Sequence, residues 1–399
     1  MADILNLPVS QKKKDGQTLL IEAASEMLAE QPPSNISSRR LAKRAGVHHT
    51  LMNYTHGSIA ELLAAAYRQE KSNFNDVDIF ETTERSPSFP LAGYPNYWRA
   101  YVYLTLDAFK PELEQELVRG HSIGKAAATL QERSPDMSSA TIDALAATWW
   151  SLQIGALVFE KPFSQGLSIS LRHRDLVQEL AAKRLDDLFA STPNDIQKRD
   201  IPNFFARQPK KSALDESGRE AVENKLVQAA IELLKERADT GISGRELAQR
   251  AEVNYGLIHH YFGSKEAVFD KAFVDMHELY VQSRIVDQDH HLAEPFSMIT
   301  HEPFFRNWAY RELAGIGMPP IDLIGQRLLL DDLCERHGIE RRSGRAFAEV
   351  QADAYCSLSV QLGWVLCRQN LLKILDTDEL VLLGRMTNIV DWFITRQWR

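Results

Sequence analysis

The sequence predicts an all-α protein built from two similar halves, and three observations lead to this prediction. Segments throughout the chain place apolar residues at positions i, i+3, i+4 and i+7, which is the spacing of an amphipathic helix. No segment sustains the alternation of apolar and polar residues that is typical of a strand. Finally, a stretch of about forty residues near the start recurs in the second half of the chain at one fixed offset.

The repeat is clearest between ISSRRLAKRAGV, which starts at Ile36, and ISGRELAQRAEV, which starts at Ile242. The two stretches align without a gap at an offset of 206 positions. At the same offset Leu20 meets Leu226, and Gly57-Ser58 meets Gly263-Ser264. A period of this length is far longer than that of solenoid repeats. The pattern therefore indicates a duplicated domain.

Each copy begins with an amphipathic helix and a break. The helix contains LLIEAASEML in the first copy and LVQAAIELLKE in the second. The breaks that follow read QPPSN and ADTG, and both are rich in turn residues. Ser37 and Ser243 then stand where a helix N-cap is expected. In the second copy, Ser243 and Glu246 also have the spacing of a capping box.

A second short helix, a tight turn and a third short helix follow. The turn falls at Gly46-Val47 in the first copy and at Glu252-Val253 in the second. The third helix begins at His48 or Asn254. Two short helices joined by such a turn form a helix-turn-helix, whose second helix can enter the DNA major groove. A generic helical hairpin is the alternative, and two matches at identical spacing favour the helix-turn-helix.

These residues resemble the DNA-binding head of the TetR (tetracycline repressor) family, in which Leu-Ala-x-x-Ala-Gly-Val precedes a recognition helix, an aromatic pair and Ser-Lys-Glu. The second copy, LAQRAEVNYGLIHHYFGSKEAVF, resembles that pattern closely. The first copy keeps LAKRAGV but departs from it further on. Thr50 replaces the glycine, Thr55-His56 replaces the aromatic pair, and Ile59-Ala60 replaces Lys-Glu. The first head is therefore expected to be degenerate.

The resemblance implies a helical ligand-binding and dimerisation domain after each head. Helical periodicity supports this independently at residues 98–119, 139–162, 173–190, 304–316, 321–337, 345–371 and 378–396. A faint echo of the repeat also links YWRAYVYLTL and FFRNWAYREL, at an offset of 207. The expected domains are a first head at 15–72, a first helical domain at 92–190, a linker at 191–220, a second head at 221–281 and a second helical domain at 295–399.

The resemblance to the family implies a two-fold dimer, in which each subunit supplies one recognition helix to a half-site. One chain with two heads and two helical domains therefore predicts an intramolecular pseudo-dimer that is a monomer in solution. The predicted linker is rich in Pro, Ser and charge, and about thirty extended residues reach on the order of 100 Å. The recognition helices HHTLMNYT and NYGLIHHY differ at most exposed positions. Unlike half-sites in the operator are expected.

The partner implied is a double-stranded DNA operator. Residues near the start of a recognition helix face base edges, so base contacts are expected from His48, His49, Thr50, Asn53, Asn254, Tyr255, Gly256 and His259. Phosphate contacts are expected from Arg39, Lys43, Tyr54, His260, Tyr261 and Lys265. Simple solvated surface is the alternative for each. Basic arms at Lys12-Lys13-Lys14 and Lys210-Lys211 either reach a minor groove or only add solubility.

A small apolar effector is the second partner that the resemblance implies. Aromatic side chains suited to an apolar cavity are Trp98, Tyr101, Trp149, Phe305, Trp308 and Trp364, and plain core packing is the alternative for each. Two pockets are possible, one per half. Repression, relieved by the effector, is the usual mode of the family.

Composition narrows the class of protein further. The chain has 399 residues and a formal charge of −8, which argues against a coat-like, non-specific nucleic-acid binder. The three cysteines form no disulfide or metal-binding pattern, which predicts a reduced protein. The start of the chain has no signal-peptide core, and no run of about 18 apolar residues is present, so a cytoplasmic protein is expected. No catalytic, metal or cofactor motif is found, so neither an enzyme nor a cofactor is expected. A helical adaptor or ligand sensor whose heads no longer bind DNA is the alternative function.

Overall fold

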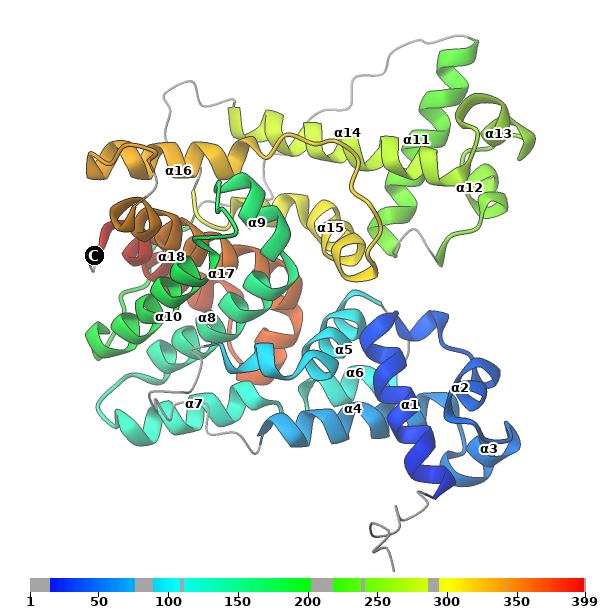
Figure 1. Cartoon of the computed structure of the whole chain (residues 1–399), viewed down its shortest axis with the longest axis horizontal. Helices are drawn as coiled ribbons and strands as arrows, with labels where there is room; N and C mark the ends of the chain where they lie inside the picture. The colour runs from blue at the N-terminus through cyan, green and yellow to red at the C-terminus, as the bar shows by residue number, and fades with distance from the viewer. Residues whose placement is uncertain are drawn as a thin grey trace, which may run out of the picture.

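The computed structural model describes residues 15–75, 89–107, 111–201, 218–237, 241–285, 294–342 and 344–397. Within these ranges every regular element is a helix (Figure 1). This confirms the predicted all-α fold. The basic clusters expected at Lys12-Lys13-Lys14 and at Lys210-Lys211 lie outside the described residues.

Each half begins with a head of short helices followed by a long helix that leads into the body. The first head consists of α1 (Gly16–Glu30), the 3-10 turn η1 (Pro33–Asn35), α2 (Ser38–Ala45), α3 (Thr50–His56) and α4 (Ile59–Asn75). The second consists of α11 (Arg219–Glu236), α12 (Gly244–Arg250), α13 (Gly256–Phe262) and α14 (Lys265–Ile285). The first residues of α12, α13 and α14 each follow those of α2, α3 and α4 by 206 positions.

The body consists of the remaining helices of both halves. The first half supplies η2 (Pro90–Gly93), α5 (Pro95–Leu106), α6 (Pro111–Val118), α7 (Ser122–Arg133), α8 (Ser139–Val158), α9 (Glu160–Gly166) and α10 (Arg174–Ser191). The second supplies η5 (Ser297–His301), α15 (Glu302–Ala314), α16 (Ile324–His337), α17 (Arg345–Leu375) and α18 (Glu379–Thr395). Figure 1 shows the two heads at one end of the molecule, on opposite sides of this shared body.

The predicted helix at 139–162 is divided in the structure. It ends as α8 at Val158, and α9 continues from Glu160 at an angle of 78°. Pro162 explains the break, because its ring would collide with the carbonyl of Val158 in a continuous helix and it has no N–H to donate. The corresponding segment of the second half has no proline and forms the single 31-residue helix α17.

The centre of the body is the crossing of α8 with α17. A Cβ atom added at Gly155 would collide with the Ser359 backbone carbonyl, and one added at Gly363 would collide with that of Ser151. The two helices therefore cross with their backbones in direct contact, as small residues allow. The contact is reciprocal, because Ser151 and Gly155 stand 208 positions before Ser359 and Gly363.

Further contacts of the same region repeat between the halves. The Leu91 backbone N–H donates to Gln153 Oε1 at 3.1 Å, and the Phe296 N–H donates to Gln361 Oε1 at 2.9 Å. Helix α10 packs against α17, and α18 packs against α8. The two halves thus share one interior, to which both contribute equivalent helices.

The beginning of the predicted linker is well ordered by hydrogen bonds. The Asn194 carbonyl accepts from the Ser138 N–H at 2.8 Å, and the Gln197 carbonyl accepts from Asn388 Nδ2 at 2.7 Å. The Arg199 N–H then donates to the Gly384 carbonyl at 3.3 Å. Residues 192–201 therefore run along α8 and then along α18. This path leads the chain from the first half to the second.

Within the described ranges, no single helix is both long and apolar enough to cross a membrane. Only α8 and α9 taken together have such a length and composition, and they meet at the 78° bend described above.

Candidate DNA-binding heads and effector cavity

Residues that are identical in the two heads hold the helices of each head together. Arg44 of α2 donates to both carboxylate oxygens of Glu30 on α1, each at 2.6 Å. In the second head Arg250 pairs with Glu236 at 2.9 Å, and these two residues stand 206 positions after Arg44 and Glu30. Both arginines are committed to a neighbouring helix, so their repetition reflects the architecture of the head.

The tight turn between the second and third helices of a head requires a left-handed backbone. Gly46 supplies it in the first head with φ +66°, which suits a residue without a Cβ. Glu252 occupies the equivalent place in the second head with φ +55°. The Ser243 Oγ accepts from the Glu246 N–H at 3.2 Å, as the predicted capping box requires, but the Glu246 carboxylate pairs with Arg237.

Two of the residues expected to read bases also form local bonds at the start of the recognition helices. Asn254 Oδ1 accepts from the Gly256 N–H at 2.8 Å, so the side chain closes the first turn of α13. His48, at the equivalent position of the first head, places Nδ1 2.8 Å from Thr50 Oγ1 at the start of α3. Both side chains are exposed, and both turn toward their own helix.

Tyr255 and His259 form a fixed pair on the recognition helix α13. His259 Nδ1 lies 3.0 Å from the Gly263 carbonyl, which can only accept, so Nδ1 carries the proton. Nε2 then accepts from the Tyr255 hydroxyl at 3.2 Å. The Tyr255 ring lies over Gly244, where a side chain would collide with it. These contacts hold an aromatic hydroxyl and an imidazole in one orientation on a face that is open to solvent.

The recognition helix of the first head exposes different side chains. Asn53 is exposed, and the Tyr54 side chain is 90% exposed. Thr55, which replaces an aromatic residue of the family pattern, donates its hydroxyl to the Leu51 carbonyl at 2.8 Å. The Thr55 hydroxyl is therefore bonded within α3 itself.

The lysine at the start of the second head's long helix is partly engaged. Lys265 Nζ donates to the Ile242 carbonyl at 2.7 Å and lies 3.9 Å from Glu266 Oε1. An ammonium group has three protons, so the other two stay available for a phosphate. The equivalent position of the first head is Ile59, which offers no such donor.

Most of the predicted DNA-contacting residues of the two heads are exposed to solvent. The exposed ones are Arg39, Lys43, His48, His49, Thr50, Asn53, Tyr54, Asn254, Tyr255, Gly256, His259 and His260, whereas Tyr261 and Lys265 are half-buried. Helices α3 and α13 lie at the same end of the molecule (Figure 1).

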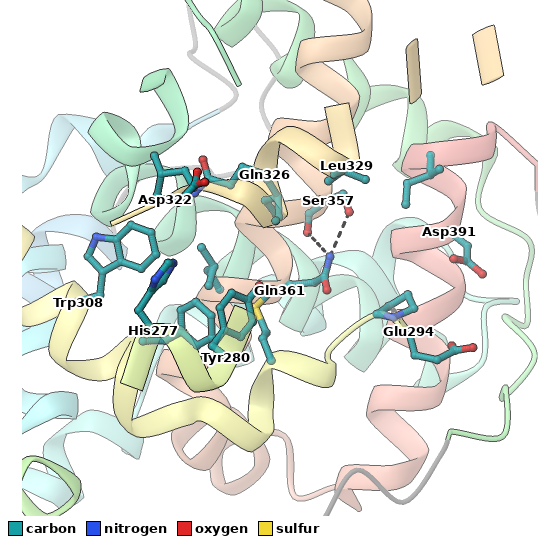
Figure 2. Close-up of a pocket in the computed structure, with 18 of the residues that line it drawn as sticks. His277, Tyr280, Glu294, Trp308, Asp322, Gln326, Leu329, Ser357, Gln361 and Asp391 are labelled. Carbon is teal, nitrogen blue, oxygen red and sulfur yellow. Dashed lines mark hydrogen bonds between the residues drawn. The ribbon is translucent and has the colours of Figure 1, made fainter. Parts of the chain in front are cut away.

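A cavity of about 340 Å³ lies in the second half, between α14, α15, α16, α17 and α18. Figure 2 shows Trp308, His277 and Tyr280 on one side of it and Glu294 and Asp391 on the other. Of the predicted pocket residues, Phe305 and Trp308 line this cavity. Trp98, Tyr101, Trp149 and Trp364 are buried and do not line this cavity.

The cavity wall contains charged groups that the sequence did not predict. Arg199, from the linker, donates to Asp391 Oδ2 at 2.6 Å and to Glu294 Oε2 at 3.3 Å. Burial lowers the pKa of His277, which favours the neutral imidazole. Gln361 donates to the Ser357 carbonyl and hydroxyl, both at 3.2 Å. The cavity therefore combines aromatic faces with a polar rim that contains an ion-paired arginine. No sequence signal marked Arg199, because its partners lie about 95 and 192 residues further along the chain.

The equivalent interior of the first half is filled by aromatic rings. His121 lies 4.5 Å from the Trp150 ring and 5.2 Å from the Tyr101 ring, measured between centroids. Tyr97 stacks on Phe74 at 5.2 Å. All five side chains are buried. The interiors of the two halves therefore differ, with a cavity in the second and an aromatic cluster in the first.

Comparison with known proteins relates the second head to a family of regulatory proteins. Residues 226–272 match the tetR family of bacterial regulatory proteins. The chain is 42% identical over 50 residues to the HTH-type transcriptional repressor Rv3405c of Mycobacterium tuberculosis and to the HTH-type transcriptional regulator Mb3439c of Mycobacterium bovis. That match covers 12% of this chain and 27% of each relative, so the chain spans about a quarter of the length of the curated relatives it matches. The second head is a helix-turn-helix domain of the tetR type.

Proposed function

We propose that the chain is a sequence-specific DNA-binding regulator of transcription, and a repressor by default. The observation that carries this proposal is the second head, where a tetR-type match coincides with an open recognition helix. Its Tyr255 and His259 are held in one orientation on an exposed face. Pre-organised side chains lose little conformational freedom on binding, which favours specific recognition.

We further propose that the two halves arose by duplication and form a pseudo-dimer within one chain. The helices of the two heads repeat at a spacing of 206 residues, and α8 crosses α17 by a reciprocal backbone contact. Such a chain presents two heads without a concentration-dependent assembly step, because each half is tethered to its partner. The chain would bind as a monomer, with one head for each half-site.

Equivalent substitutions in the two heads test the proposal. Tyr255→Ala with His259→Ala removes the oriented pair of the second head, and we expect affinity for a selected DNA duplex to fall about tenfold or more, since base contacts contribute on the order of 1–3 kcal/mol each. His49→Ala with Asn53→Ala changes the equivalent positions of the first head. A smaller loss there, measured by fluorescence anisotropy, is expected from its departures from the family pattern.

The matched control is Arg345→Gln, on an exposed turn of α17. It should leave DNA affinity unchanged. Equal, salt-insensitive binding by the parent and both head variants would contradict specific DNA recognition and favour an adaptor that kept the fold.

The cavity of the second half is the proposed effector site. Its aromatic wall suits a small molecule with an apolar body, and its rim accommodates polar substituents. An effector acts only through its different affinity for the DNA-bound and free states. The filled interior of the first half supports one effector per chain.

Filling the cavity tests this part of the proposal. Leu358, which lines it, is buried. Leu358→Trp should abolish binding of the apolar dye ANS at the cavity and shift DNA affinity in the direction that the effector does. Dye binding that persists unchanged in this variant would place the site elsewhere.

A further inference from the structure

Two arginines at equivalent positions reach across from one half to the other. Arg99 of α5 and Arg306 of α15 are separated by 207 residues, the offset at which the sequences of these helices resemble each other. Arg99 Nη2 donates to the Leu313 carbonyl of α15 at 2.6 Å. Arg306 Nη2 donates to the Thr105 and Leu106 carbonyls of α5, at 3.0 and 3.1 Å.

The acceptors explain why arginine is suited to both positions. Leu313 and Leu106 lie in the last turns of α15 and α5, whose carbonyls have no partner within their own helix. The C-terminus of a helix also carries partial negative charge, which favours a cation. Each arginine therefore supplies a charge-assisted cap to the helix of the other half.

A tyrosine pair marks the axis between the two arginines. The rings of Tyr103 and Tyr310 meet edge to face, with their centroids 6.0 Å apart, and these residues are also separated by 207 positions. A residue that meets its own counterpart lies on the axis that relates the halves. Figure 1 shows α5 and α15 facing each other in the space between the two heads.

Helices α5 and α15 also form hydrogen bonds with the first helix of each head. Arg99 Nε donates to the Ala29 carbonyl at 2.6 Å, and the Tyr103 hydroxyl donates to the Glu30 carbonyl at 3.1 Å, both at the end of α1. On the other side, Asn307 Nδ2 donates to the Leu234 carbonyl of α11 at 2.8 Å. Arg99, helix α15 and Asn307 therefore connect the first helix of one head to the first helix of the other.

We propose that Arg99, Arg306 and the Tyr103–Tyr310 pair form a clasp that sets the separation of the two heads. In this role the two arginines are positioning residues: they touch no DNA but determine which half-site spacing the recognition helices can span. The consequence for DNA rests on the proposed DNA-binding function, whereas the effect on head separation does not.

The first test measures head separation directly, without DNA. Glu26→Cys and Glu232→Cys place equivalent, exposed spin-label sites on α1 and α11, and all three native cysteines are buried. Pulsed electron paramagnetic resonance on this full-length background should give one narrow distance distribution. Arg99→Gln with Arg306→Gln should broaden it, and Arg99→Lys with Arg306→Lys should recover part of the sharpness. Arg345→Gln is the matched control and should leave it narrow.

A distribution that stays narrow in the double glutamine variant would overturn the clasp. If circular dichroism shows that this variant does not fold, the single change Arg306→Gln decides the matter. It removes the bonds to Thr105 and Leu106 and the ion pair with Glu302 on the same helix, and it leaves Arg99 in place. It must broaden the distribution, and an unchanged width would again overturn the proposal.

The second test uses DNA with two half-sites. The double glutamine variant should bind the preferred spacing about tenfold more weakly, since rigid pre-organisation is lost, while its affinity for an isolated half-site stays at the parent level. Equal losses on both duplexes would contradict a positioning role. If even the parent binds no duplex, the proposed function fails, and the label distances still decide the clasp.

Discussion

Individual residues divide into those that build the heads and those that face solvent. Arg44 and Arg250, with Glu30 and Glu236, join the helices of their heads by equivalent ion pairs. By contrast, exposed equivalent positions carry different residues in the two heads: His49 corresponds to Tyr255, and Asn53 corresponds to His259. The repeat could be found from sequence because the first set is shared. The second set is where the two heads would differ in DNA preference.

Local sequence patterns predicted the capping residues, but they could not predict contacts between residues far apart in the sequence. Ser37 and Ser243 were predictable because an N-cap acts within three residues. Arg99, Arg199 and Arg306 were not singled out, because their partners include carbonyls and carboxylates about 95 to 214 residues away.

At the same scale, His121 predicts a dependence of stability on pH. Its Nδ1 accepts from the Ile123 N–H at 3.2 Å, and burial lowers its pKa to about 3. The unfolded chain binds this proton below about pH 6.5, whereas the folded chain does not, so stability is full above that pH and falls as pH decreases toward 3. The loss between pH 7 and 5 should be about 2 kcal/mol.

The variant His121→Asn keeps an acceptor for the Ile123 N–H and removes the titration. Urea unfolding at pH 7 and pH 5 should show it less stable than the parent at pH 7, with a pH-induced loss smaller by about 2 kcal/mol. Parallel pH dependence in the two proteins would show that this imidazole titrates in the folded state.

At the scale of the elements, helical periodicity located most of the body, but not where its helices break or cross. Residues 139–162 have helical periodicity throughout, yet Pro162 divides them into α8 and α9. The crossing of α8 and α17 depends on backbones from both halves meeting at Gly155 and Gly363. A single helix pattern contains no information on which glycine faces another backbone.

That crossing makes a prediction about glycine substitutions. Gly155→Ala would force a methyl group against the Ser359 carbonyl, so we expect unfolding free energy to fall by about 3 kcal/mol, at the upper end for overpacking. Gly124 of α7 is the control, because a Cβ there has open space around it. Gly124→Ala should raise stability by about 0.5–1 kcal/mol. Thermal and urea denaturation measure both, and equal effects would contradict the close crossing.

At the scale of the whole molecule, the two halves are alike in architecture and unlike in detail. The second head has the tetR-type match and an oriented Tyr255–His259 pair, and its half contains the 340 Å³ cavity. The first half has a recognition helix that exposes Asn53 and Tyr54, and its interior holds a cluster of aromatic rings around Trp150. This difference predicts that a small molecule would bind in the second half and not in the first.

The all-α fold and the second head followed from sequence, and two of the six predicted pocket aromatics, Phe305 and Trp308, line the cavity. The other four aromatics pack in the interior, because a large buried ring and a cavity-lining ring have the same periodicity and differ only in the volume left beside them. Likewise, the contacts of His48 with Thr50 and of Asn254 with Gly256 could not be told from sequence, because an exposed polar residue at the start of a helix is equally compatible with a base contact.

The measurement that most directly tests the central claim is selection of bound sequences from a random duplex library by the purified full-length chain at near-physiological salt. The two-headed account predicts two unlike half-sites about one helical turn apart, bound by one chain per duplex as measured by sedimentation. A library that remains random after selection would contradict it, and so would a clean palindrome bound by two chains.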